Sequence, residues 1–148
     1  MEAKEWLRDH PNAFMEHNFM EVAELTPDRA VTSLTIRPEV RNPYGVAHGG
    51  ALYTLADNAT GMVAHMDGRS YVTQSSNMYF LQNQTEGVIR AEATVKRRGR
   101  TTCLVEVDIT GENGKLLASG TFVHFCVDQT VRPFPTPNQT TESASMES

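Results

Sequence analysis

The sequence is poor in cysteine and has no long apolar run, and each shortage excludes a class of protein. Its 148 residues include two cysteines, Cys103 and Cys126. Neither lies in a ligand motif, so they fit reduced thiols better than a disulfide framework or a zinc site. No segment approaches the roughly 18 apolar residues of a membrane span, and the first residues, MEAKEWLRDH, are too charged for a signal peptide. The sequence therefore predicts a cytoplasmic protein without a membrane segment.

Positive charge is also in short supply. Lys and Arg number 13 against 18 Asp and Glu, which gives a formal net charge of -5 at pH 7. This acidic balance matches neither nucleic acid nor an anionic membrane surface, so we expect neither as a partner. The five histidines show no metal-ligand spacing, and we expect no metal and no cofactor.

Apolar and polar residues alternate in most of the chain, and only one segment has the spacing of a long helix. The helix is predicted over residues 49–66, where apolar residues recur every three or four positions. Strands are predicted over 19–25, 30–36, 70–81, 86–96, 100–110 and 115–127. The Asn113-Gly114 pair between the last two strands tolerates positive φ and predicts a hairpin turn.

The two ends of the chain differ from the region between them. Residues 1–17 predict an N-terminal helical extension, a short helix that stops at His10-Pro11, because proline cannot continue a helical hydrogen-bond ladder. Residues 18–127 hold the strands and the long helix and are expected to form one domain. Residues 128–148 are rich in Pro, Ser and Thr, cannot build a core and are predicted to be a disordered tail.

This order of elements predicts an α+β fold, a curved antiparallel β-sheet wrapped around one long central helix. We expect the strands to pair as sequential hairpins. The helix is rich in Ala, Gly and Thr, so a sheet can approach it closely. A single sheet of this kind leaves an apolar face or exposed edges, and the sequence therefore also predicts dimerisation.

Two glycines, Gly49 and Gly50, begin the long helix. The first amides of a helix have no partner within it, and the helix dipole places partial positive charge there. Glycine lets another atom come close, so a carbonyl oxygen at this point would be polarised and an oxyanion stabilised. The alternative is that the two glycines only allow the loop to turn and the helix to pack.

Asp57 lies well off the apolar stripe of the same helix, so its carboxylate is either solvated or directed into a cleft. Gly49 and Asp57 are eight residues apart, or about 12 Å along the helix axis. Groups that far apart cannot both contact one reacting carbon. If both act, they come from different chains, and catalysis requires a dimer.

One stretch of the sequence carries a specific motif. Asn42-x-x-Gly45-x-x-His48-Gly49-Gly50, followed by Leu55-Ala56-Asp57, resembles the signature of hotdog-fold acyl-CoA thioesterases of the phenylacetate-degradation (PaaI-like) type. The resemblance covers residues 18–127, which would be the hotdog thioesterase domain. It implies hydrolysis of an acyl-CoA, with CoA as part of the substrate and no cofactor, by a homodimer that pairs into a homotetramer.

The resemblance also implies roles for single residues. Asp57 resembles the catalytic carboxylate, acting as general base on water or as nucleophile, and Gly49 the backbone donor to the thioester carbonyl. Asn42 resembles the residue that holds water or substrate. His48 resembles the histidine packed beside the helix start. Gly50 and Tyr53, next along the helix, are expected to contact the substrate.

Two further features complete the expected site. A Ser or Thr on the strand after the helix often assists in this family, and we assign that role to Thr73, with Ser75 and Ser76 as alternatives. The run 96–101, KRRGRT, concentrates positive charge in an acidic chain. It is either a solvated hairpin or a site for the CoA phosphates, and we expect Arg98 and Arg100 to contact them.

The sequence leaves the acyl group open. Aromatic and methionine side chains suit an acyl pocket and core packing equally well, namely Tyr44, Tyr53, Met62, Met66, Met78 and Phe80. Two other functions compete with a thioesterase: a hotdog acyl-thioester dehydratase and a non-catalytic acyl-CoA-sensing module. His124 and Cys126, which alternate on the last strand, are expected to be packing residues.

Overall fold

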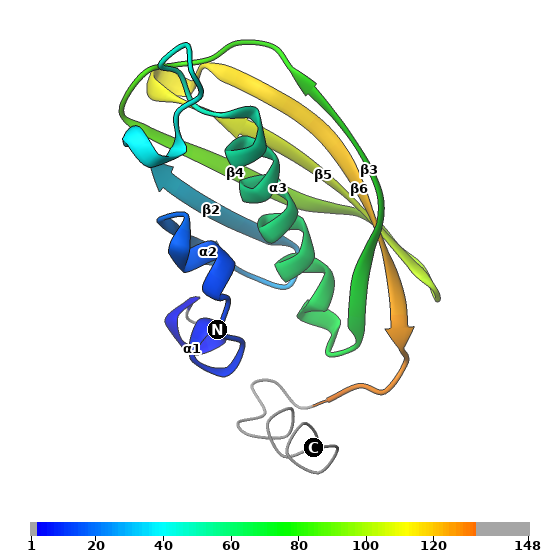
Figure 1. The fold of residues 1–148 in the computed structure, drawn as a ribbon. Coiled ribbons are helices and arrows are strands. Elements are labelled where there is room, and N and C mark those ends of the chain that lie inside the picture. The colour runs from blue at the N-terminus through cyan, green and yellow to red at the C-terminus, as the bar shows by residue number, and fades with distance from the viewer. Residues whose placement is uncertain (1–2, 133–148) are drawn as a thin grey trace.

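In a computed structural model, which describes residues 3–132, a curved six-stranded antiparallel sheet packs around one long helix (Figure 1). The elements are α1 (Ala3–Asp9), α2 (Ala13–His17), β1 (Met20–Leu25), β2 (Arg29–Thr35), α3 (Gly49–Ala64), β3 (Ser70–Phe80), β4 (Val88–Arg98), β5 (Thr102–Thr110) and β6 (Leu116–Asp128). The predicted fold class, the long helix and all six strands are confirmed. The turn before β6 has the expected positive φ at Asn113 (61°) and Gly114 (72°).

The strand order is β1-β2-β4-β5-β6-β3, which corrects one expectation. β3 does not form a hairpin with β4. It pairs with β6 at the far edge of the sheet, and residues 81–87 carry the chain across to β4. Alternation along a strand indicates which face a side chain occupies, but it does not indicate which strand lies beside it. The consequence is that β3 follows α3 directly and ends as an edge strand.

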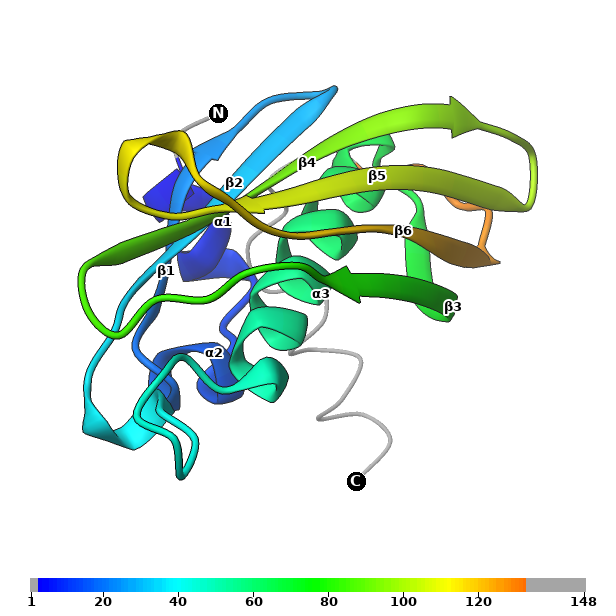
Figure 2. The same ribbon diagram turned by 90° about the horizontal axis from the view of Figure 1, so that it is seen from above.

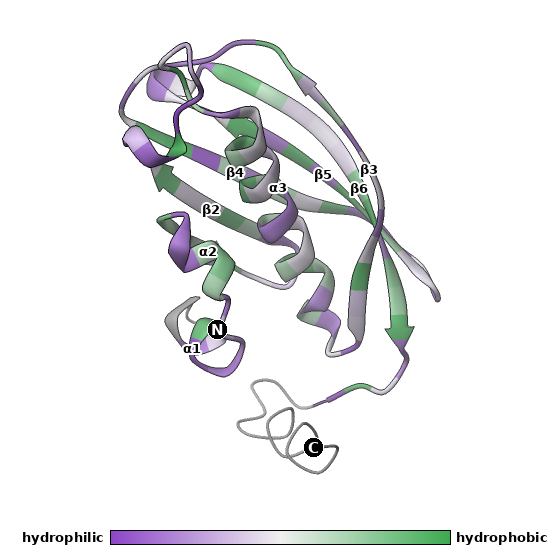
Figure 3. Ribbon diagram, in the orientation of Figure 1, coloured by the Kyte–Doolittle hydropathy of each residue, from purple (hydrophilic) through white to green (hydrophobic). Residues whose placement is uncertain are grey.

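The core lies between α3 and the inner face of the sheet (Figure 2). Leu52, Leu55 and Ala59 of α3 are at most 1% exposed. Ala91 and Ala93 on β4 are small enough to let the helix approach the sheet closely. The Thr32 hydroxyl on β2 donates to the Leu55 carbonyl at 2.8 Å. In Figure 3 hydrophobic and hydrophilic segments alternate along the strands, as one buried face requires.

The N-terminal extension consists of two short helices, and the first ends just before His10-Pro11, as predicted. The second helix was not predicted. It begins at an Asn12 cap, whose side-chain oxygen accepts the Met15 amide at 2.9 Å. At the other end Arg132 donates its amide to the Gly68 carbonyl at 3.1 Å. The rest of the predicted tail, 133–148, lies outside the described residues. No helix in the described part of the chain is long and apolar enough to span a membrane.

Candidate active site

The loop before α3 is held by short-range hydrogen bonds. The Asn42 side-chain oxygen accepts the amides of Tyr44 and Val46 at 2.9 and 3.4 Å, which closes an Asx turn. His48 is the helix cap, and its Nδ1 accepts the Gly50 amide at 2.8 Å. For Nδ1 to accept, a neutral imidazole must carry its proton on Nε2. The loop therefore fixes the direction from which the chain enters the helix.

The structure distinguishes the two glycines at the helix start. The Gly50 amide is taken by His48, whereas the Gly49 amide has no acceptor within residues 3–132. A Cβ at Gly50 would lie 3.0 Å from the His48 Nδ1. A Cβ at Gly49 would meet only the Phe80 ring, at an ordinary 3.8 Å. The open amide at the positive end of the helix dipole is therefore that of Gly49.

Asp57 lies on α3 two turns after Gly49, half-buried and facing β3. The Thr73 hydroxyl donates to Asp57 Oδ1 at 2.8 Å. Asp57 Oδ2 has no hydrogen-bond donor among the residues that the structure describes. The carboxylate is thus held by one oxygen, while the other can accept from water or attack a substrate.

A β-bulge explains which hydroxyl of β3 faces the helix. The β3–β6 register shifts between Thr73 and Ser75, so that Gln74 is an extra residue. Ser75 pairs with Val123 on the outer face. Ser76 is directed to α3, where its hydroxyl hydrogen-bonds the Tyr53 hydroxyl. Of the three hydroxyls weighed from the sequence, only that of Thr73 reaches the Asp57 carboxylate.

Tyr53 lies one helical turn before Asp57. Besides its hydroxyl contact with Ser76, its ring packs against Phe80 and against the edge of Phe122, with centroids 6.4 and 5.6 Å away. Tyr53 is half-buried, so the ring belongs partly to the core and partly to the surface between α3 and β3.

Sequence reasoning assigned His124 to packing only, but its imidazole reaches this site. The side chain is 1% exposed, with Nδ1 3.4 Å from the Thr73 hydroxyl and Nε2 2.9 Å from the Thr60 hydroxyl. Burial lowers the pKa of His124 to about 4, although the Asp57 charge opposes this shift. The imidazole is therefore neutral at pH 7. The signal in the sequence was a polar residue on the inner face of β6 between Phe122 and Cys126.

Arg98 and Arg100 occupy different environments. Arg98 donates to the carbonyls of Val63 and Ala64 at 3.0 and 2.7 Å and pairs with Asp67 at 3.0 Å. It therefore closes the C-terminal end of α3, and these donors are not directed at solvent. Arg100 is exposed at the turn between β4 and β5, where its guanidinium has no acceptor among residues 3–132.

A groove of about 790 Å³ runs along α3 past the Asp57 carboxylate. One wall comes from α3 and β3, and the other comes from the N-terminal extension. Its lining includes Trp6, His10, Asn12, Asp57, Met62, Tyr71, Thr73 and His124. Of the six side chains considered for an acyl pocket, Met62 alone lines the groove, and Tyr44 is 91% exposed.

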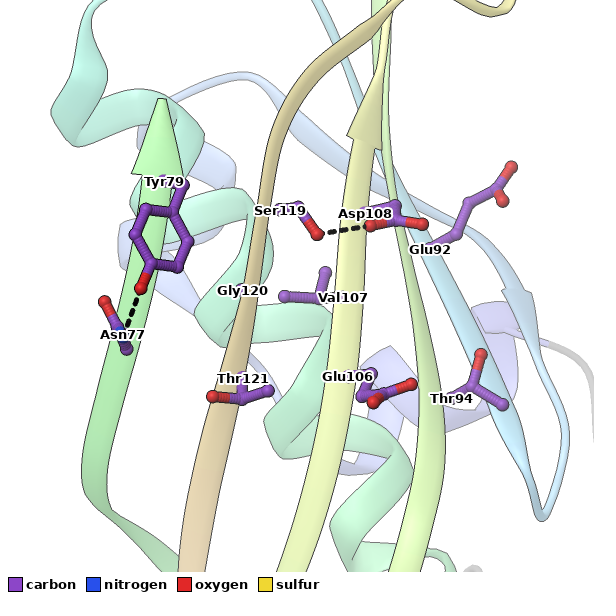
Figure 4. Close-up of a pocket in the computed structure, with 10 residues that line it drawn as sticks. All are labelled: Asn77, Tyr79, Glu92, Thr94, Glu106, Val107, Asp108, Ser119, Gly120 and Thr121. Atoms are coloured by element: carbon purple, nitrogen blue, oxygen red, sulfur yellow. Dashed lines mark hydrogen bonds between the residues drawn. The ribbon is translucent and has the colours of Figure 1, made fainter. Parts of the chain in front are cut away.

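A second hollow, of about 340 Å³, lies on the outer face of the sheet and has different chemistry (Figure 4). Glu92, Glu106 and Asp108 line it, together with hydroxyl side chains such as Ser119, which donates to Asp108 at 2.7 Å. Carboxylates repel phosphate, and a lining that is mostly polar offers little surface to an acyl group. The groove beside Asp57 is therefore the candidate active site. The described residues contain no group of three or more His, Cys, Asp or Glu able to hold a metal.

The chain is similar to a known family, to two characterised or named relatives and to a solved structure. Residues 44–118 match the thioesterase superfamily. A putative esterase of Deinococcus radiodurans is 33% identical over 67% of this chain and 68% of that protein, and the acyl-coenzyme A thioesterase PaaI of Escherichia coli is 28% identical over 60% and 64%. A solved structure of a hypothetical thioesterase protein with coenzyme A from Streptococcus pneumoniae is similar with a TM-score of 0.73 and 31% identity, over 77% of this chain and 91% of that one.

Proposed function

Because the chain belongs to the thioesterase superfamily and has the hotdog fold of its PaaI-like members, we propose that it hydrolyses acyl-CoA to a free acid and CoA. Asp57 acts as general base on water or as nucleophile, and the Gly49 amide polarises the thioester carbonyl. The observation that carries this proposal is the Asp57 carboxylate, which is held through one oxygen by Thr73 and lines a groove with the other oxygen open.

The site requires two subunits. Gly49 and Asp57 of one chain are about 12 Å apart along α3, too far to contact one thioester. β3 is an edge strand with exposed residues at 72–77 and apolar side chains at Tyr79 and Phe80, which favours pairing with another copy. We propose that two β3 strands pair antiparallel about a two-fold axis near residues 76 and 77.

The register of this pairing brings the two groups together. With the axis between residues 76 and 77, Thr73 lies opposite the partner subunit's Phe80. Phe80 is the side chain that a Cβ at Gly49 would meet, and Thr73 is the one hydrogen-bonded to Asp57. Paired strands are about 4.8 Å apart, so the partner subunit's Gly49 amide then faces the Asp57 carboxylate across one crevice. The same dimer can pair into a tetramer.

The remaining residues bind and orient. Asn42 keeps its Nδ2 without an acceptor in residues 3–132 and is available to water or substrate. The His48 side chain accepts from the Gly50 amide, so the Gly49 amide is the one left to donate to the thioester carbonyl. Tyr53, beside Asp57, contacts the substrate. We assign the CoA phosphates to Arg100, and no longer to Arg98, because Arg98 is bonded to the end of α3.

The acyl group fits the groove beside Asp57, between α3 and the N-terminal extension. This placement follows from the carboxylate, which must lie next to the acyl carbon that it or its water attacks. Trp6 and Met62 supply apolar surface, and His10 stacks on Trp6 with ring centroids 3.7 Å apart. The extension would then limit which acyl groups fit.

The proposal is tested by assaying thiol release from short, medium and aromatic acyl-CoAs with the purified protein and with Asp57→Asn. Release by the wild type and its loss in the variant are expected. Binding of acyl-CoA without turnover would identify a sensing module instead, and enoyl product from 3-hydroxyacyl-CoA a dehydratase. Single-turnover hydrolysis in oxygen-18 water separates the two roles of Asp57, since label enters the carboxylate only if Asp57 is the nucleophile.

A further inference from the structure

A line of hydrogen-bonding side chains runs behind the Asp57 carboxylate, from β3 through β6 and back to α3. Thr73 Oγ1 lies 2.8 Å from Asp57 Oδ1 and 3.4 Å from His124 Nδ1. The other imidazole nitrogen, Nε2, lies 2.9 Å from the Thr60 hydroxyl. Thr60 and His124 are buried, at 0% and 1% exposure, whereas Thr73 is exposed on the edge strand.

The tautomer of His124 decides which group donates and which accepts in each of these hydrogen bonds, because each hydroxyl and the neutral imidazole have only one proton to donate. The Thr73 hydroxyl has one proton. If that proton is donated to Asp57, Thr73 can only accept from His124, so Nδ1 must carry the imidazole proton. Nε2 is then an acceptor, and the Thr60 hydroxyl must donate to it. Each member donates to the next, and the line ends at the carboxylate.

The opposite tautomer reverses the line. With the proton on Nε2, His124 donates to Thr60, whose hydroxyl then turns to the Asp57 backbone carbonyl at 3.1 Å. The bare Nδ1 now competes with the Asp57 carboxylate for the single proton of Thr73. The tautomer therefore determines whether the Thr73 proton goes to Asp57 alone or is shared between Asp57 and His124.

We propose that His124 and Thr60 are positioning residues, which keep the Thr73 hydroxyl directed at Asp57 by holding the imidazole proton on Nδ1. The proposal rests on the proposed role of Asp57. Oδ1 is thereby fixed, and Oδ2 keeps the orientation needed to accept from water or to attack. The titratable groups whose charge acts on His124 are Asp57 and His65, and the Asp57 charge favours the direction in which donors point toward it.

Thr60→Val tests the proposal with a matched control. It removes one hydroxyl at constant shape, and Thr32→Val does the same to a second buried hydroxyl, which is bonded to the Leu55 carbonyl of the same helix. Thr60→Val is expected to lower kcat about three- to tenfold with KM unchanged, and Thr32→Val to stay within about twofold of wild type. Thr60→Ser should restore kcat. Equal kcat in Thr60→Val and Thr32→Val would overturn the proposal.

Two further measurements keep the failure of this proposal separate from failure of the proposed function. In the Asp57→Asn background, Thr60→Val should have no further effect on the residual rate, since it acts only through Asp57. Long-range ¹⁵N–¹H spectra of the His124 ring report its tautomer whether or not the protein hydrolyses a thioester. They are expected to show Nδ1–H in the wild type and less of it in Thr60→Val. An Nε2–H tautomer in the wild type would contradict the proposal even in an active enzyme.

Discussion

The N-terminal end of α3 has amides with partial positive charge and the C-terminal end has carbonyls with partial negative charge, and only the carbonyls receive a side-chain partner from the sheet. At the N-terminal end the Gly49 amide has no acceptor in the part of the chain described, and glycine leaves the space beside it open. At the C-terminal end Arg98 donates to the carbonyls of Val63 and Ala64. One end is left able to bind, and the other is closed by a side chain.

The carboxylates of Asp67 and Asp57 also differ in how many hydrogen-bond donors they have. At the closed end Asp67 receives hydrogen bonds from Arg69 and Tyr71 and an ion pair from Arg98. In the middle of α3 Asp57 receives one hydrogen bond, from Thr73, and keeps one oxygen without a partner among residues 3–132. Stability therefore comes from the groups whose hydrogen bonds are satisfied, around Arg98 and Asp67, and chemistry is expected at the Gly49 amide and the Asp57 carboxylate, where they are not. Variants of these residues test this difference, from the largest expected effect to the smallest.

Asp57→Asn is expected to have the largest effect, a loss of about 10²–10⁴ in kcat. The amide keeps the size of the carboxylate and can still accept from Thr73, so the fold should not change. Steady-state kinetics beside a urea titration separate activity from stability. Near-normal turnover would remove Asp57 from the mechanism.

Gly49→Pro removes the amide proton proposed to polarise the thioester carbonyl and adds a ring beside it. Gly49 is the first residue of α3, where proline is tolerated, and His48 before it already has the extended φ of -65° and ψ of 134° that proline requires. We expect kcat to fall about 10²–10³ with stability maintained. Gly49→Ala keeps the N–H and is the control, so a smaller loss is expected for it. Equal losses in the two variants would mean that space, and not the proton, matters at Gly49.

Acid should weaken the two regions at different pH. His124 has a pKa of about 4 when folded, below its ordinary 6.5. The unfolded chain therefore binds this proton first, so the free energy of unfolding is unaffected by His124 above pH 6.5 and falls as the pH is lowered toward 4. This loss is about 3 kcal/mol. Burial acts to raise the pKa of Asp67, but hydrogen bonds from Tyr71 and Arg69 outweigh it and the pKa is lowered. Its contribution is therefore lost only below its ordinary value of 3.8.

The measurement is the free energy of unfolding by urea between pH 7 and 4, for the wild type and His124→Leu. The wild type should lose stability steadily over this range, and the variant should lose less. Parallel curves for the two proteins would show that the His124 imidazole is not the group responsible.

Arg98→Gln and Arg100→Gln separate the closed end of the helix from the proposed CoA contact. Loss of Arg98 leaves helix carbonyls and Asp67 short of donors and is expected to cost about 2 kcal/mol of stability without changing KM. Arg100→Gln should leave stability unchanged and raise KM about three- to fivefold, as expected for one exposed phosphate contact. A raised KM in Arg98→Gln alone would reverse this assignment.

Much of the fold could be predicted because periodicity is a local property. The stripe of 49–66 and the alternation in the strands correspond to real elements, and Asn113-Gly114 has the turn geometry that its residues favour. The position of β3 at the far edge of the sheet could not be predicted, because partner choice depends on long-range packing that no local pattern encodes.

The geometry of the candidate site could be predicted from the sequence only in part, for similar reasons. The motif located the Gly49 amide and Asp57, but only the hydrogen bond of His48 shows why Gly49 and not Gly50 has the open amide. A bulge at Gln74, invisible in the sequence, selects Thr73. His124 was interpreted as a packing residue because the sequence does not indicate that Thr60 of the long helix faces its imidazole.

Subunit exchange tests the central claim most directly. Asp57→Asn and Gly49→Pro are each expected to be nearly inactive as pure proteins. If every site combines Gly49 of one subunit with Asp57 of the other, each hybrid dimer has one intact site and one site that carries both changes. Random mixing of equal amounts makes about half of the dimers hybrids, so activity should return to about a quarter of the wild-type value. If both groups act within one chain, every site in the hybrid is damaged, and a mixture that stays inactive after confirmed exchange would contradict the account.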